Sequence, residues 1–93
     1  SELKKAVPQD AKCIILNDVS NYIFSYLVDK RGYVFFYDGI EPGWVYDLIK
    51  NHNVKYMYSD SEKINANPEF QKYFAKTILN AGSVNVFELI EIK

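Results

Sequence analysis

The chain has little cysteine, and that shortage limits its chemistry. It holds one cysteine, Cys13, among 93 residues, so no internal disulfide can form. The residues after it, Ile14 to Leu16, are apolar, whereas a reactive thiol needs an exposed and electropositive setting. We therefore expect Cys13 to behave as a small buried hydrophobe. The missing disulfide fits a reducing compartment without excluding an extracytoplasmic one.

Long hydrophobic runs are also missing. No window approaches the roughly 18 consecutive apolar residues of a membrane span, and the amino terminus lacks the pattern of a secretory signal peptide. The chain begins at Ser1 with a polar stretch, as a piece of a longer protein would. We expect residues 1–10 to be a polar lead-in from such a parent chain. Residues 11–93 are then long enough for one α/β domain with a single core.

Neither charge nor motifs point to nucleic acid, a cofactor or a metal. The formal net charge is -1, which predicts no nucleic-acid partner. Residues 17–21 contain no glycine, although a phosphate-binding loop after a first strand needs several. His52 is the only histidine, so we interpret it as a solvated residue at a helix end. No serine lies in a nucleophile-elbow sequence, and we expect no catalytic residue, cofactor or metal in this chain.

The most informative stretch that is present runs from Cys13 to Leu16. It is apolar at every position, which is typical of a strand covered on both faces. It ends at two polar residues, Asn17 and Asp18, before an amphipathic segment begins. The first, central strand of an open α/β sheet usually has this pattern.

The remaining segments alternate between helical and strand patterns. Two helices are expected at about 20–28 and 42–51, the second with Val45, Leu48, Ile49 and Trp44 on its apolar face. A third is expected to begin at Asn67-Pro68, a cap followed by proline, and to continue to Gly82. Aromatic and β-branched runs predict the other strands, at 33–37, 54–58 and 84–92.

This alternation, β-α-β-α-β-α-β, predicts the fold class. We expect a three-layer, Rossmann-like open sheet of four mostly parallel strands with three helices. The preferred strand order is 3-2-1-4, which places the last strand at an edge, and a flavodoxin-like order is the alternative. In either case the carboxyl ends of the parallel strands are where a ligand would bind.

Polar residues gather at those expected strand ends. Together they could bind sugar hydroxyls or a divalent cation, although helix capping and turn formation are the preferred explanation. The candidate ligand-binding residues are Asn17, Asp18, Ser20, Asp38, Ser59 and Asp60. Lys30 and Arg31 form one compact basic point, which could contact an anionic headgroup or merely cap a helix end.

Several short motifs resemble a known domain. Three motifs follow one another along the chain: the lead-in at residues 7–12, the run Lys30-Arg31-Gly32-Tyr33 and the run Val54-Lys55-Tyr56. This order resembles the soluble carboxyl-terminal domain of bacterial membrane glycosyltransferases of the dolichyl-phosphate-mannose protein mannosyltransferase type. The glycine that usually precedes the third run is replaced here by residues 51–53.

The resemblance implies a non-catalytic domain on the extracytoplasmic, periplasmic face of the membrane. The parent enzyme would transfer sugar from a polyprenyl-phosphate donor, and its catalytic acids lie between membrane helices that this sequence does not include. The implied partners are the membrane-spanning part of the parent chain and a saccharide or lipid-linked sugar. A free-standing soluble module that binds another protein through its aromatic surface is the alternative, and a small cytoplasmic enzyme is a third.

Overall fold

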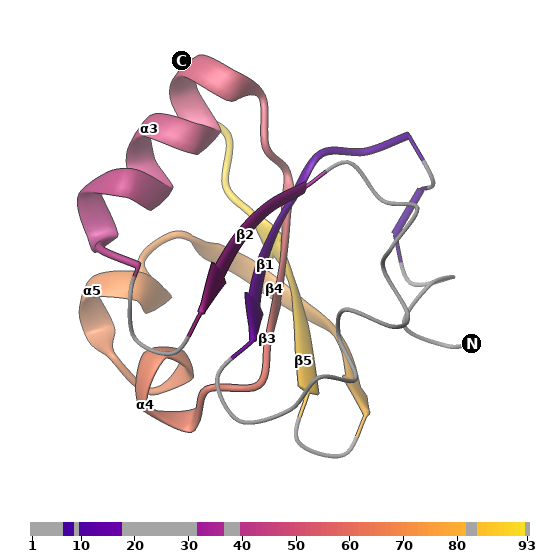
Figure 1. The fold of residues 1–93 in the computed structure, drawn as a ribbon, viewed down its shortest axis with the longest axis vertical. Coiled ribbons are helices and arrows are strands. Elements are labelled where there is room, and N and C mark those ends of the chain that lie inside the picture. Colours follow the sequence, from indigo (N-terminus) through magenta and orange to yellow (C-terminus); the bar gives the residue numbers. More distant parts are fainter. Residues whose placement is uncertain (1–6, 9, 18–31, 37–39, 82–83, 93) are drawn as a thin grey trace.

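The computed structural model describes residues 7–8, 10–17, 32–36, 40–81 and 84–92, and these form a sheet with helices on one face (Figure 1). The five strands are β1 (Cys13–Asn17), β2 (Gly32–Phe36), β3 (Tyr56–Ser59), β4 (Phe74–Ala81) and β5 (Val84–Leu89). The helices are α3 (Pro42–His52), α4 (Glu62–Asn65) and α5 (Pro68–Gln71). The helix expected at 20–28 lies outside the described residues.

The sheet is mixed, so the predicted Rossmann-like fold of four mostly parallel strands is wrong. Its order is β2-β1-β3-β5-β4, not 3-2-1-4. β1 pairs with β2 and with β3 in parallel, whereas β5 is antiparallel to both β3 and β4. The last strand therefore lies inside the sheet, and β4 takes the edge that had been expected for it.

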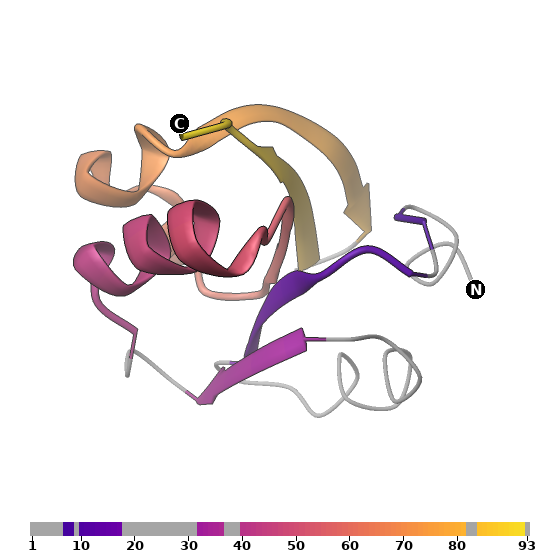
Figure 2. The same ribbon diagram turned by 90° about the horizontal axis from the view of Figure 1, so that it is seen from above.

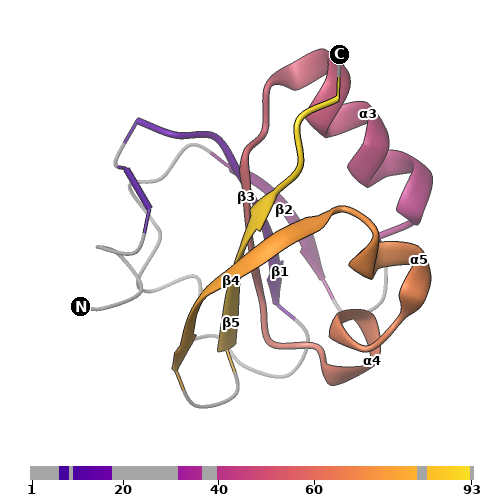
Figure 3. The same cartoon turned by 180° about the vertical axis from the view of Figure 1, so that it is seen from behind.

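The error arises in the segment that was expected to be one long helix from Pro68 to Gly82. α5 ends at Gln71, and residues 74–81 form β4, which runs away from α5 along the edge of the sheet (Figure 3). Its pairing with β5 shifts register between Phe74 and Lys76 and again between Thr77 and Leu79. Such irregularities break the two-residue period of a strand. Phe74 packs against the helical-side core and Ile78 packs on the opposite face of the sheet, so their four-residue spacing, which imitates a helix, does not mark one face here.

β1 confirms the prediction of a strand covered on both faces. It lies between β2 and β3, and Cys13, Ile14 and Leu16 are each 0% exposed. Ile14 and Leu16 belong to the core cluster on the helical side. Cys13 and Ile15 belong to a second cluster on the opposite side, together with Val7. Figure 2 shows these two sides, with the helices on one and residues 10–12 leading into β1 on the other.

α3 covers the parallel part of the sheet largely as expected. Pro42 occupies its first turn, and Asn53 ends it in the left-handed conformation with φ 57°. Val45, Leu48 and Ile49 are buried, which confirms three members of the predicted apolar face. Trp44 is not buried with them, because 46% of its surface remains exposed.

The two short helices depend on side-chain caps. Ser61 Oγ accepts a hydrogen bond of 3.3 Å from the backbone N–H of Ile64 at the start of α4. Asn67 Oδ1 accepts one of 2.9 Å from the N–H of Glu69, which confirms the predicted cap before Pro68. A helix of four residues cannot form alone in water, so burial of Ile64 and Phe70 against the core must stabilise both.

Candidate functional site

The structure brings together part of the ligand site that the sequence predicts. β1 and β3 are parallel neighbours with Leu16 beside Ser59, so their carboxyl ends, which carry Asn17 and Asp60, lie at one edge. The N–H of Asp60 donates to the carbonyl of Leu16 at 3.4 Å. The other predicted residues, Asp18, Ser20, Lys30, Arg31 and Asp38, lie outside the described residues, and their roles stay predictions.

Ser59, Asp60 and Ser61, at this edge, are buried. Ser59 and Ser61 are 0% exposed and Asp60 is 3% exposed. Ser59 Oγ accepts a hydrogen bond of 3.2 Å from the N–H of Ser61, and Ser61 caps α4. Both serines therefore have a structural task, which is to hold the turn from β3 into α4. A ligand would reach these residues only if this turn moved.

Tyr58 lies on the opposite face of the same strand and is 0% exposed. Burial raises the pKa of its phenol above the ordinary value of 10.0, and the nearby Cys13 raises it further. Above about pH 10 the unfolded chain therefore loses this proton while the folded chain keeps it. The free energy of unfolding should then fall as the pH rises, by up to about 1.4 kcal/mol per pH unit.

Urea unfolding of the wild type and of Tyr58→Phe, measured from neutral pH upward, tests this expectation. The variant should show a shallower loss of stability above about pH 10, because it lacks the buried phenol. Equal slopes for the two proteins would mean that Tyr58 titrates normally in the folded chain.

A second group of residues lies along the junction between α3 and the edge strand β2, and we call it the α3 seam. It comprises Tyr33 and Phe35 from β2 and Trp44, Asp47, Asn51 and His52 from α3. Tyr33 and Phe35 are two residues apart, so their side chains leave β2 on one face, and both pack against the helical-side core. The ring centroids of Phe35 and Trp44 are 5.8 Å apart, and those of Tyr33 and His52 are 5.6 Å apart.

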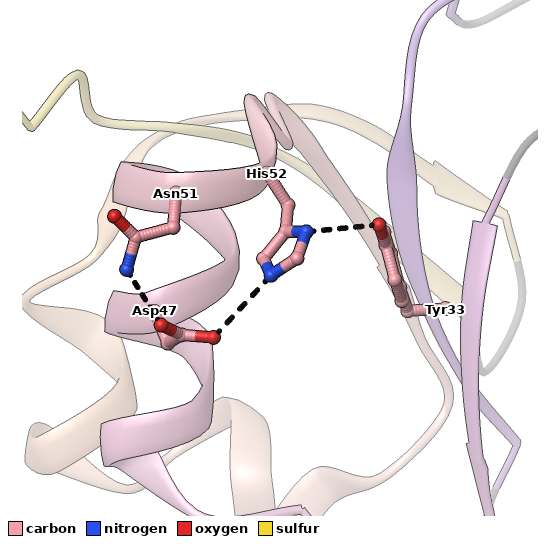
Figure 4. Close-up of polar contacts among 4 residues, drawn as sticks. All are labelled: Tyr33, Asp47, Asn51 and His52. Carbon is pink, nitrogen blue, oxygen red and sulfur yellow. Dashed lines mark hydrogen bonds and ion pairs between the residues drawn. The ribbon is translucent and has the colours of Figure 1, made fainter.

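Polar contacts connect side chains of the seam toward the carboxyl-terminal end of α3, as Figure 4 shows. Tyr33 Oη lies 3.3 Å from His52 Nδ1, and His52 Nε2 lies 3.6 Å from Asp47 Oδ2. The tautomer protonated on Nε2 points its N–H toward Asp47 and lets Nδ1 accept from the phenol. Asn51 Nδ2 donates a hydrogen bond of 2.6 Å to the other oxygen of Asp47. The seam thus offers a fixed set of donors and acceptors beside exposed rings.

The group formed by Asp47, His52 and Tyr33 is poorly suited to proton transfer. An aspartate, a histidine and a hydroxyl in series also occur in nucleophilic catalysis. Here, however, the side chains of His52 and Asp47 are 45% and 56% exposed. Water screens charges at such positions, whereas catalysis depends on fixed dipoles in a site that excludes water. The arrangement is better suited to binding a neutral polar ligand.

Reasoning from the sequence assigned His52 only to a helix end and missed the seam. The available signal was the spacing of Trp44, Asp47 and Asn51, since residues three, four and seven apart share a helix flank. Nothing in the sequence, however, brings Tyr33 next to His52. That contact depends on α3 packing beside β2.

A hollow of about 430 Å³ lies at the other edge of the sheet, beside β4 and β5. Four carboxamide side chains and two phenylalanine rings dominate its lining, so we call it the amide groove: Asn65, Gln71, Asn80, Asn85, Phe74 and Phe87. Lys76 and Thr77 complete the lining. Asn65 and Gln71 come from α4 and α5, and the other six residues come from the two strands.

The described part of the chain lacks two features. Within it, no three histidine, cysteine, aspartate or glutamate side chains gather as metal ligands. None of its helices combines the length and hydrophobicity that crossing a bilayer requires.

Comparison of the chain with models of known protein families, with curated proteins and with solved structures finds no match. The resemblance to the glycosyltransferase domain is therefore carried by its short motifs alone.

Proposed function

We propose that this chain is a non-catalytic domain that holds a saccharide for a polytopic membrane glycosyltransferase using polyprenyl-phosphate sugar donors. The glycosyltransferase attribution comes from the resemblance in motif order. The saccharide comes from one observation: Trp44 is 46% exposed and lies on the same helix flank as Asp47 and Asn51. An accessible ring beside a carboxylate and an amide is the combination that a sugar needs.

The ring supplies the apolar part of the interaction. One face of a pyranose ring carries mainly C–H groups, which pack well on an aromatic surface. Contact with Phe35, at a centroid distance of 5.8 Å, restrains the Trp44 ring before any ligand arrives. Binding then costs less side-chain entropy than it would with a freely moving ring.

The polar groups supply orientation. Asp47 accepts hydrogen bonds, and Asn51 both donates and accepts them, as sugar hydroxyls do. Because an α-helix rises about 1.5 Å per residue, these two residues lie about 4.5 and 10.5 Å along the axis from Trp44. A disaccharide laid along α3 can reach both from a ring stacked on Trp44.

The proposal includes a place in the cell and a partner. The domain would lie on the extracytoplasmic, periplasmic side of the membrane and pack against the membrane-spanning part of its parent chain. Sequencing the coding region upstream of residue 1 tests this part. Membrane helices encoded there in the same reading frame support it, and a start codon immediately before residue 1 contradicts it.

A protein-binding module is the second candidate, and it has its own supporting observation. Tyr46 is 41% exposed and lies two residues from Trp44, on a different flank of α3. Lys50 Nζ lies 5.7 Å from the centre of its ring. Two accessible aromatic rings on one helix are typical of protein interfaces.

The single tryptophan of the chain gives a direct test, because Trp44 is the only one. Titration with a mannose disaccharide should change the tryptophan emission in a saturable way. Amide NMR signals of Asp47 and Asn51 should shift at the same midpoint. If neither mannose nor glucose disaccharides move emission or signals, saccharide holding at the seam is wrong and only a packing role remains.

A further inference from the structure

The amide groove carries an inference that does not depend on the α3 seam. We propose that it is a binding site for an acetamido sugar of the N-acetylglucosamine class, which it recognises through the acetamido group. The walls of the groove, its hydrogen-bonding groups and its charge each contribute to this assignment.

The fold leaves this part of the sheet open. Asn85 and Phe87 alternate along β5 and lie beside Ser59 and Met57 of β3. Met57 belongs to the core cluster on the helical side, so Asn85 and Phe87 face that side too. Figure 3 shows β4 running away from α5 beside β5, and Asn65 of α4 and Gln71 of α5 supply the other wall. The result is a hollow with a strand floor and a helical wall.

The hydrogen-bonding groups match a secondary amide. Each of the four carboxamides carries two N–H donors and an oxygen acceptor, and one donor of Gln71 is already used in a hydrogen bond of 3.0 Å to the backbone carbonyl of Asn65. An acetamido group presents one donor and one acceptor. Asn65 Oδ1 is shielded from water and accepts no hydrogen bond from the part of the chain that the structure describes. Because the last torsion of asparagine is soft, its carboxamide can turn to meet the N–H of a ligand.

The apolar part of the groove matches the acetyl methyl group. Phe74 and Phe87 stack in parallel with ring centroids 4.0 Å apart, and both line the groove. Phe87 is 7% exposed, so only a small part of its surface is available. Phe74 is half-buried and adds to this apolar surface, which can contact a methyl group.

Charge also favours a neutral ligand. Among the described residues that line the groove, Lys76 alone is charged, and its Nζ lies 3.9 Å from Glu88 Oε2. The carboxylate of Glu88 offsets the positive charge of Lys76, so the groove does not strongly attract an anion. An uncharged polar ligand of one or two sugar rings fits both its volume and its chemistry.

NMR titration of the whole chain with N-acetylglucosamine, glucose and Nα-acetyl-lysine methylamide tests the proposal. We expect N-acetylglucosamine to shift the side-chain amide signals of Asn65, Asn80 and Asn85, and glucose to leave them unchanged. Equal shifts with glucose would overturn acetamido recognition. Shifts with the acetylated lysine but not with the sugar would assign the groove to acetylated protein, and no shift with any probe would overturn the site.

Two variants at exposed positions locate the effect. Asn80 is exposed, so Asn80→Ala should fold normally and should raise the dissociation constant for N-acetylglucosamine about fivefold, as loss of one hydrogen bond implies. Lys55→Ala, at an exposed position outside both the groove and the α3 seam, should leave it unchanged. Equal effects from the two variants would contradict a site in the groove. Because Trp44 emission reports the seam separately, failure at the groove and failure of the proposed function are distinguishable.

Discussion

Replacing Trp44 with alanine is expected to weaken binding of a mannose disaccharide at least about tenfold. A tenfold change corresponds to about 1.4 kcal/mol, and the contact between a sugar face and an indole ring is large enough to supply it. Trp44 is 46% exposed, so the substitution should cost the fold far less than a core change would. Calorimetric titration measures the affinity, and thermal unfolding checks that the variant remains folded.

Tyr46→Ala is the matched control for that experiment. Tyr46 lies on the same helix and is exposed to a similar degree, 41%, but it does not belong to the α3 seam. We expect its loss to leave the affinity within about twofold, since it contributes no contact to the bound sugar. If Trp44→Ala bound the disaccharide as tightly as the wild type, the α3 seam would not be the saccharide-binding surface. Equal losses in both variants would favour the protein-binding alternative.

The largest expected effect on stability comes from Ile14→Ala in the middle of β1. Ile14 is 0% exposed and lies between Tyr33 of β2 and Met57 of β3. Truncating such a side chain costs about 2–5 kcal/mol, because apolar contacts are lost and a cavity remains. Stabilities of about 0.05–0.15 kcal/mol per residue are usual, so this one change removes a large part of the total. The melting temperature should fall by roughly 15 °C.

Two milder substitutions provide a scale for that loss of stability. Ile14→Val removes one methylene group and should cost about 1 kcal/mol. Lys76→Ala lies at an exposed position of β4 and should change stability by no more than about 0.5 kcal/mol. Urea unfolding of all three variants gives the comparison. A loss below about 1 kcal/mol for Ile14→Ala would contradict the placement of β1 inside the sheet.

Local patterns succeeded wherever one side-chain period applied without interruption. The unbroken apolar run from Cys13 to Leu16 predicted a covered strand, because no position in it has to meet water. Proline at the first turn and apolar residues at helical spacing predicted α3. The same reasoning failed at residues 74–81, where register shifts in β4 put Phe74 and Ile78 on opposite faces of the sheet despite their helix-like spacing. A side-chain period cannot reveal an irregularity that only the partner strand defines.

The candidate sites show the same division. The sequence indicated polar residues at the strand ends, and the structure brings the ends of β1 and β3 together, with Ser59 and Asp60 buried. The sequence also contained the spacing of Trp44, Asp47 and Asn51, but it did not indicate the contact between α3 and β2. The amide groove could not be foreseen, because its two walls come from α4–α5 and from strands whose pairing was mispredicted.

By itself, the sequence determined the local elements of this protein: the covered strand β1, the amphipathic helix α3 and the capped start of α5. These depend on contacts within a few residues, such as the hydrogen bond from Glu69 to the Asn67 side chain. Only the tertiary structure decided the order and direction of the strands, and with them both candidate binding surfaces. Strand pairing joins residues that are distant in the chain, and its outcome depends on how apolar surface is shared across the whole sheet rather than on any local pattern.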